Sequence, residues 1–152
     1  MAMATHAGSV AAQSHPSPHG AKVGLGLVLF GVFGGPAAWA AQLIANYGLA
    51  SYSCYPRYAP RTQLVPGWEG IWTFLLIINL VAAAVALIAA AMAYRTWRLT
   101  RHEHPGNYGH ALEAGEGRTR FLGIVGIMTG LGFFLATVFD TIALFIVPQC
   151  IG

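Results

Sequence analysis

One acidic residue lies inside a long apolar run near the C-terminus, and it is the side chain with the clearest capacity for chemistry. Between Arg120 and Pro148 the chain has 27 residues, and Asp140 is the only charged one among them. A run of this length and composition predicts a membrane-spanning helix. A carboxylate in hydrocarbon costs at least about 2.5 kcal/mol on insertion scales, so we expect Asp140 to face protein or water.

Amide side chains in the other apolar runs are the partners that the sequence offers to this carboxyl group. Gln42 and Asn46 belong to the first run, and Asn79 belongs to the second. At about 1.5 Å per residue, Asn46, Asn79 and Asp140 fall at similar depth from the same side of the membrane. We therefore predict a polar layer of Gln42, Asn46, Asn79 and Asp140. Asp140 then acts as a hydrogen-bonded lock between helices, or alternatively as a proton carrier.

Metal and haem chemistry would need other residues. All 6 histidines lie in the N-terminal tail or in the polar loop between the second and third runs. A bis-histidine membrane haem requires histidines inside the spans, and a c-type haem requires CxxCH, so we expect this chain alone to bind neither. His102, Glu103, His104 and His110 are metal-ligand types, but a solvated loop without fixed geometry explains them as well. No cofactor is predicted for the chain alone.

The chain has 2 cysteines, and both stand at the ends of apolar runs. Cys54 closes the first run and Cys150 follows the third, which places them on the same side of the membrane at similar height. A disulfide requires Cα atoms within about 7 Å, so a Cys54–Cys150 bridge would make the first and third helices neighbours there. Two unpaired thiols at the membrane surface are the alternative. The cysteines lie on the opposite side from the histidines, which argues against a Cys/His catalytic pair and against an enzyme.

Composition identifies the elements that must position these residues. The 152-residue chain is 56% hydrophobic and only 9% charged, which is typical of an integral membrane protein. We predict an all-α fold with a disordered tail over 1–20 and one membrane domain over 21–152, built from spans at about 23–52, 70–93 and 121–147. Its arginines lie at the ends of the apolar runs, so they predict topology rather than nucleic-acid binding.

Small residues indicate how the spans pack. Glycines recur on one face of the first helix and on one face of the third, and such faces let backbones approach closely. We therefore predict a close three-helix bundle. Pro36 removes a backbone hydrogen bond in the first span, which predicts either a packing kink or a discontinuous helix whose free carbonyls bind an ion. The predicted packing residues are Gly31, Gly35, Pro36, Gly123, Gly126 and Gly130.

Charge and aromatic residues predict orientation and membrane contact. An odd number of spans places six basic residues on the side of the N-terminus against two, Arg57 and Arg61, on the other. Positive residues favour the cytoplasm, so the N-terminus should be cytoplasmic and the C-terminus periplasmic, with lipid around the spans. The basic residues are Lys22, Arg95, Arg98, Arg101, Arg118 and Arg120, and the tryptophans expected at the interfaces are Trp68, Trp72 and Trp97.

The chain also resembles a bacterial family of small three-span proteins that are encoded beside haem–copper cytochrome c oxidase genes. The resemblance rests on GGPAAWAAQLIANYGLASYSC (Gly34–Cys54), LEAGEGRTRFLGIVGI (Leu112–Ile127) and FIVPQC (Phe145–Cys150). It implies an accessory or assembly role beside oxidase subunits in the inner membrane, with no catalytic residue to carry over. The matching positions are Gly35, Pro36, Trp39, Gln42, Asn46, Cys54, Glu113, Gly115, Glu116, Arg118, Arg120 and Cys150.

Two functions are therefore expected. The first is a non-catalytic accessory or assembly membrane subunit that docks through its small-residue and aromatic faces. The second is a small oligomeric transport or proton-relay protein in which Asp140 titrates and a break of the helix at Pro36 forms part of the path.

Overall fold

The described part of the chain forms three long α-helices. A computed structural model describes residues 24–55, 64, 66–100, 116–147 and 150. The helices are α1 (Leu25–Cys54), α2 (Ile71–Thr100) and α3 (Glu116–Ile146). All are long and apolar enough to cross a membrane, so this is a multi-pass membrane protein and the predicted all-α, three-span fold is confirmed. The predicted tail over 1–20 lies outside the described residues.

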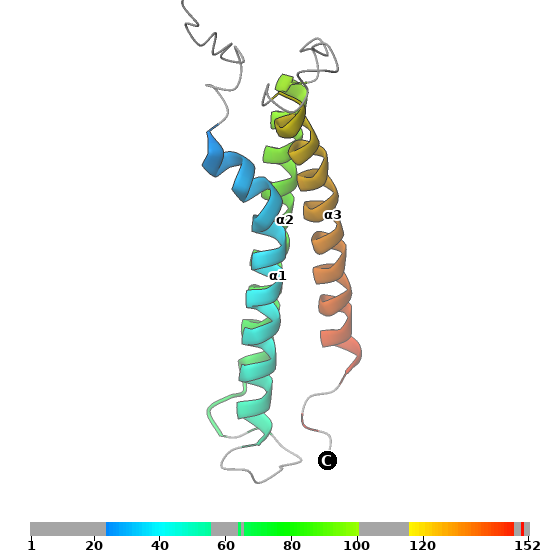
Figure 1. Cartoon of the computed structure of the whole chain (residues 1–152). Coiled ribbons are helices and arrows are strands. Elements are labelled where there is room, and N and C mark those ends of the chain that lie inside the picture. The colour runs from blue at the N-terminus through cyan, green and yellow to red at the C-terminus, as the bar shows by residue number, and fades with distance from the viewer. Residues whose placement is uncertain (1–23, 56–63, 65, 101–115, 148–149, 151–152) are drawn as a thin grey trace, which may run out of the picture.

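The helices alternate in direction, and each contacts the other two. Figure 1 shows α1 and α3 running the same way with α2 antiparallel to both, while α3 leans away from α1 toward its C-terminal end. We call the end that carries Cys54 and Cys150 the disulfide end. The opposite end, where α2 finishes near Arg98 and α3 begins, is called the arginine end.

Two helix boundaries differ from the predicted spans. α2 continues past Ala93 to Thr100, and α3 begins at Glu116 rather than near 121. The prediction followed the apolar runs, whereas the backbone hydrogen bonds of a helix can continue into polar sequence. At the end of α2, Thr100 Oγ1 donates to the Thr96 carbonyl at 3.1 Å, one turn back. Both helices therefore extend beyond their apolar cores at the arginine end.

Glycines in α3 allow backbone contact with both other helices. A Cβ atom placed on Gly126 would lie 2.8 Å from Ala93 Cβ and 2.9 Å from the Gly31 carbonyl oxygen. A Cβ on Gly130 would lie 2.8 Å from Ala90 Cβ. These distances are shorter than carbon contacts allow, so only glycine fits at either position. Gly35 packs on Gly130 and Gly123 on Trp97 in the same seam, which makes the bundle as close as its small residues predicted.

Pro36 leaves α1 unbroken. α1 is helical from Leu25 to Cys54, and Figure 1 shows it bending in its N-terminal third rather than separating into two helices. Proline has no N–H, so the Val32 carbonyl one turn earlier loses its usual donor. Thr129 Oγ1 on α3 donates to this oxygen at 3.2 Å. Of the two readings of Pro36, the packing kink is therefore correct, and the freed carbonyl bonds a neighbouring helix.

Aromatic pairs mark both ends of the bundle. At the disulfide end the ring centroids of Tyr52 and Trp68 are 5.6 Å apart, and those of Trp72 and Phe145 are 5.1 Å apart. At the arginine end Tyr94 packs on Trp97 at 5.7 Å, and the Arg98 guanidinium lies 5.9 Å from the Tyr94 ring. Such amphipathic rings are typical of membrane interfaces. Arg95, Arg98 and Arg120 are exposed, whereas Arg101 and the Arg118 side chain lie outside the described residues.

A tight turn leads into α2 at the disulfide end. Gly67 has a φ of 92°, in the left-handed region that glycine adopts without strain. Its N–H donates to Glu69 Oε1 at 3.1 Å. Hydrogen bonds from the backbone N–H groups of Glu69 and Gly67 hold the pKa of the Glu69 carboxyl below its usual value. The acid therefore stays charged beside the N-terminus of α2, where the helix dipole favours negative charge.

Candidate functional site

A polar cluster joins all three helices around Asp140. Trp39 Nε1 donates to Asp140 Oδ2 at 3.0 Å, and Gln42 Nε2 lies 3.3 Å from the same oxygen. Gln42 Nε2 also donates to Asn79 Oδ1 at 3.0 Å. The side chains of Gln42 and Asn79 are 2% and 0% exposed, while Asp140 is half-buried. One carboxylate oxygen therefore bonds two groups of α1, and Gln42 connects it to α2.

The other hydrogen bonds of Asn79 also lie within the bundle. Its Nδ2 donates to the Leu75 carbonyl at 2.8 Å, one turn back along α2. Thr141 Oγ1 lies 3.4 Å from Asn79 Oδ1 and 2.7 Å from the Thr137 carbonyl on its own helix. The structure thus brings Gln42, Asn79 and Asp140 of the predicted polar layer together, with Thr141 at its edge.

Trp39 belongs to this cluster although the predicted layer omitted it. The indole N–H is a donor that a buried tryptophan normally satisfies, and Trp39 lies three residues before Gln42, on the same helical face. This three-residue spacing is the feature of the sequence that could have placed Trp39 in the predicted polar layer. Trp39 also packs on Phe133 of α3 with ring centroids 5.2 Å apart, so it contacts α3 through both its ring and its nitrogen.

Asn46 lies one turn from Gln42 toward the disulfide end and does not bond with the rest of the predicted layer. Its side chain makes no hydrogen bond to any described residue, and its Oδ1 is buried. The buried Oε1 of Gln42 also has no partner in this part of the chain. The second carboxylate oxygen of Asp140 makes no hydrogen bond or ion pair within the described ranges. Asn79 of α2 is therefore fully engaged in hydrogen bonds, whereas Asn46, which lies toward the disulfide end, and one oxygen each of Gln42 and Asp140 have no partner among the described residues.

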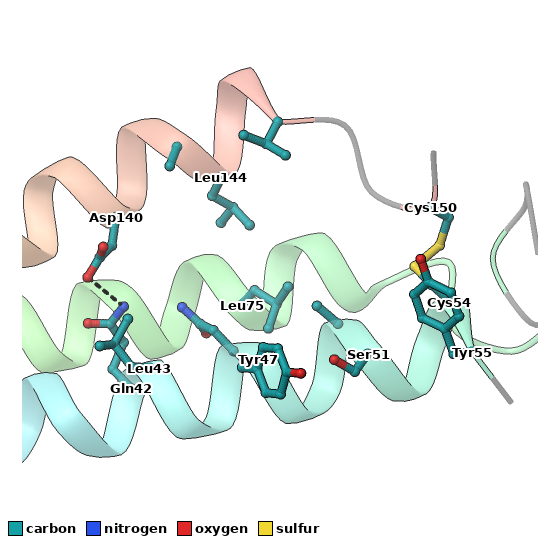
Figure 2. Close-up of a pocket in the computed structure, with 14 residues that line it drawn as sticks. Gln42, Leu43, Tyr47, Ser51, Cys54, Tyr55, Leu75, Asp140, Leu144 and Cys150 are labelled. Carbon is teal, nitrogen blue, oxygen red and sulfur yellow. Dashed lines mark hydrogen bonds between the residues drawn. A yellow bond between two sulfur atoms is a disulfide. The ribbon is translucent and has the colours of Figure 1, made fainter. Parts of the chain in front are cut away.

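A cleft opens beside these groups, between α1 and α3. Its volume is about 540 Å³, and it extends from Gln42 and Asp140 past Asn46 and Leu144 to the cysteines. Figure 2 shows α3 leaving α1 beyond Asp140, with Leu75 of α2 at the back of the gap. Tyr47, at its edge, is 79% exposed. A volume of this size falls in the range of small-molecule sites in proteins.

The Cys54–Cys150 disulfide crosses the far end of the cleft. The two Cα atoms are 5.2 Å apart, and Figure 2 shows the bridge joining α1 to the segment after α3. The disulfide alternative of the two cysteine predictions is therefore confirmed, and both residues line the cleft. The disulfide therefore links the end of α1 to the chain that follows α3, although α1 and α3 themselves are separated along the cleft.

Metal ligands do not gather in the described part of the chain. Within 24–55, 64, 66–100, 116–147 and 150, no group of three or more His, Cys, Asp or Glu side chains could hold a metal ion. The predicted loop residues His102, Glu103, His104 and His110 lie outside these ranges. Asp140, Gln42 and Asn46 are the polar residues at the inner end of the cleft, and Tyr47, Ser51 and Tyr55 line it toward the disulfide end.

The candidate site is therefore a hydrogen-bonded joint between three helices, next to a cleft with unpaired polar atoms. A carboxyl group held by an indole and an amide can fix helix positions, and its free oxygen can accept a proton or a hydroxyl donor. No family model, no curated protein and no solved structure matches this chain.

Proposed function

We propose that the protein is a non-catalytic accessory or assembly subunit of a larger membrane complex, a respiratory haem–copper oxidase. It would lie in the inner membrane of a bacterium with its N-terminus in the cytoplasm and its C-terminus in the periplasm. The resemblance of three segments to proteins encoded beside oxidase genes supports the partner. The excess of basic residues on the side of the N-terminus supports the orientation.

The observation that carries this proposal is the hydrogen bonding of Asp140 to α1. Its Oδ2 accepts hydrogen bonds from Trp39 and Gln42 of α1, so the one acid inside the spans is engaged in joining helices. Trp39 and Gln42 also stand at positions that match the oxidase-associated family. A polar group held in this way is typical of a specifically packed bundle.

The lipid-facing side of α3 supports docking to another membrane protein. Phe121, Met128, Leu135 and Phe139 are exposed along it, and a shallow groove surrounds Gly132. A Cβ atom on Gly132 would meet nothing within 4 Å, so the position is open. Small residues beside large apolar ones are the usual composition of helix–helix contacts in membranes.

Co-purification tests the proposal. The full chain with a C-terminal tag is extracted in a mild detergent from aerobically grown cells, and bound proteins are identified by mass spectrometry. We expect oxidase subunits with the unaltered chain, and a loss of them with Gly132→Trp, which fills the groove from a position where an added Cβ meets nothing within 4 Å. Gly48→Trp on α1 is the matched control, because Gly48 is equally open. Consistent absence of oxidase subunits, with unchanged oxidase levels in a deletion strain, contradicts the proposal.

A second candidate is a small oligomeric transport or proton-relay protein, and the cleft is the observation that favours it. The cleft reaches Asp140, whose second carboxylate oxygen has no partner among the described residues. In that case Asp140→Asn abolishes proton flux in proteoliposomes, because an amide cannot carry the proton. Unchanged flux with Asp140→Asn contradicts this candidate and leaves the first one standing.

A further inference from the structure

The cleft between α1 and α3 contains polar groups that the fold leaves without partners. Asn46 makes no hydrogen bond to any described residue, and its buried Oδ1 lies beside the cleft. Gln42, only 2% exposed, has a buried Oε1 in the same condition. Unsatisfied polar groups at membrane depth cost several kcal/mol each.

The depth of these groups limits what can bind them. Asn79, which bonds Gln42, lies seven residues after the interfacial Trp72, and this places the polar end of the cleft about 10 Å inside the membrane surface. A charged headgroup at this depth would be expensive. The occupant is therefore neutral at its buried end.

The shape of the cleft indicates the direction of entry. The disulfide crosses the end nearest the membrane surface, whereas Tyr47, which lines the cleft from α1, is 79% exposed. Leu43, Leu75 and Leu144 supply apolar walls. A molecule would thus enter sideways from the lipid, and its apolar part would remain in contact with the bilayer.

The unpaired atoms define the chemistry of recognition. The free oxygen of Asp140 accepts a hydrogen bond, and the amide of Asn46 can both donate and accept one. A hydroxyl group also donates and accepts, so it complements both residues. We propose that this cleft is a binding site for a neutral membrane lipid with a free hydroxyl group. A ring lipid of the quinol class and a diacylglycerol are the two sources of this chemistry, and the site would exist whatever complex the protein joins.

Binding is measured on the purified full chain in detergent by native mass spectrometry, without thiols and without oxygen, so that the disulfide and the quinol both persist. The probes are decylubiquinol and dioctanoylglycerol. Their matched controls, decylubiquinone and trioctanoylglycerol, lack the free hydroxyl. We expect saturable one-to-one binding of at least one probe, at least fivefold tighter than its own control. The probe that binds identifies the source of the hydroxyl.

Variants locate the site. Asn46→Leu should weaken binding by about fivefold to tenfold, the effect of one neutral hydrogen bond. Ala50→Phe and Ala143→Phe fill the cleft from α1 and α3 and should each abolish binding. Thr73→Val, a similar loss of polarity on the exposed face of α2, should change nothing. Circular dichroism establishes that each variant is folded.

Three results would overturn the proposal. The first is the absence of saturable binding by both probes to the folded chain. The second is equal affinity for each probe and its hydroxyl-free control. The third is binding that persists when both Ala50→Phe and Ala143→Phe are folded. None of these results bears on co-purification with an oxidase, so failure of this site and failure of the proposed function are distinguishable.

Discussion

Thr129 should stabilise the bundle only because Pro36 is present. Pro36 leaves the Val32 carbonyl without its helical donor, and Thr129 Oγ1 reaches that oxygen at 3.2 Å from α3. Thr129→Val removes the hydroxyl and keeps the shape of the side chain. An orphaned carbonyl typically costs about 1–3 kcal/mol, but hydrogen bonds between membrane helices average about 0.6 kcal/mol. We therefore expect Thr129→Val to lower the free energy of unfolding by about 1 kcal/mol.

The same substitution should cost almost nothing when Pro36 is replaced by alanine. In Pro36→Ala the new N–H returns to the Val32 carbonyl, and Thr129 can use the Gly126 carbonyl, 3.2 Å away on its own helix. The double-mutant cycle should therefore give a coupling energy of about 1 kcal/mol between the two positions. Unfolding in mixed micelles with increasing dodecyl sulfate, followed by circular dichroism, supplies the four free energies.

Thr137 is the matched control for this cycle. It is also a buried threonine of α3, 0% exposed, but its hydroxyl donates at 2.9 Å to the Phe133 carbonyl of its own helix. Thr137→Val should show no coupling to Pro36→Ala. If the coupling of Thr129 is below about 0.3 kcal/mol, or equals that of Thr137, the replacement of the missing proline donor by Thr129 is refuted.

Three further changes test other contacts, each by thermal unfolding in detergent followed by circular dichroism. Gly126→Ala should destabilise the bundle by about 1–3 kcal/mol through overpacking, whereas Gly132→Ala, in open space, should be neutral or slightly stabilising; equal effects would contradict the close seam. Asp140→Asn should retain most stability because an amide oxygen still accepts from α1, whereas Asp140→Leu should lose about 2 kcal/mol or more; similar losses would show that the cluster is not a lock. Reduction of the Cys54–Cys150 disulfide, which links residues 96 positions apart in the sequence, should lower the melting temperature by several degrees. A variant with both cysteines replaced by alanine should be insensitive to reductant. An unchanged melting temperature would mean that the disulfide adds no stability.

The spans and the disulfide were accessible to prediction for different reasons. Each apolar run exceeds the length that crosses a bilayer, so the three helices followed from composition alone. The cysteines followed from topology, since an odd number of spans places Cys54 and Cys150 on one side. Helix ends were less accessible. α3 starts at Glu116, within polar sequence, because the backbone hydrogen bonds of a helix do not depend on the hydropathy of its side chains.

The polar cluster was predictable in depth but not in its pairings. Counting residues placed Gln42, Asn79 and Asp140 at one level, and the hydrogen bonds join them there. Counting also placed Asn46 at this level, but the separation of α3 from α1 leaves it beside a cleft instead. Trp39 was overlooked because its single donor is a small part of a large apolar ring.

By itself, the sequence determined that this chain contains three runs long and apolar enough to cross a membrane, which polar residues fall at similar positions along them, and that glycines allow close approach. These properties depend on the transfer free energy and the helical position of each residue, which are local and can be summed along the chain. Only the tertiary structure decided that Thr129 serves the Val32 carbonyl, that Trp39 shares Asp140 with Gln42, and that a cleft separates α1 from α3. These pairings depend on the rotation and tilt of each helix, which are set jointly by contacts from the other two.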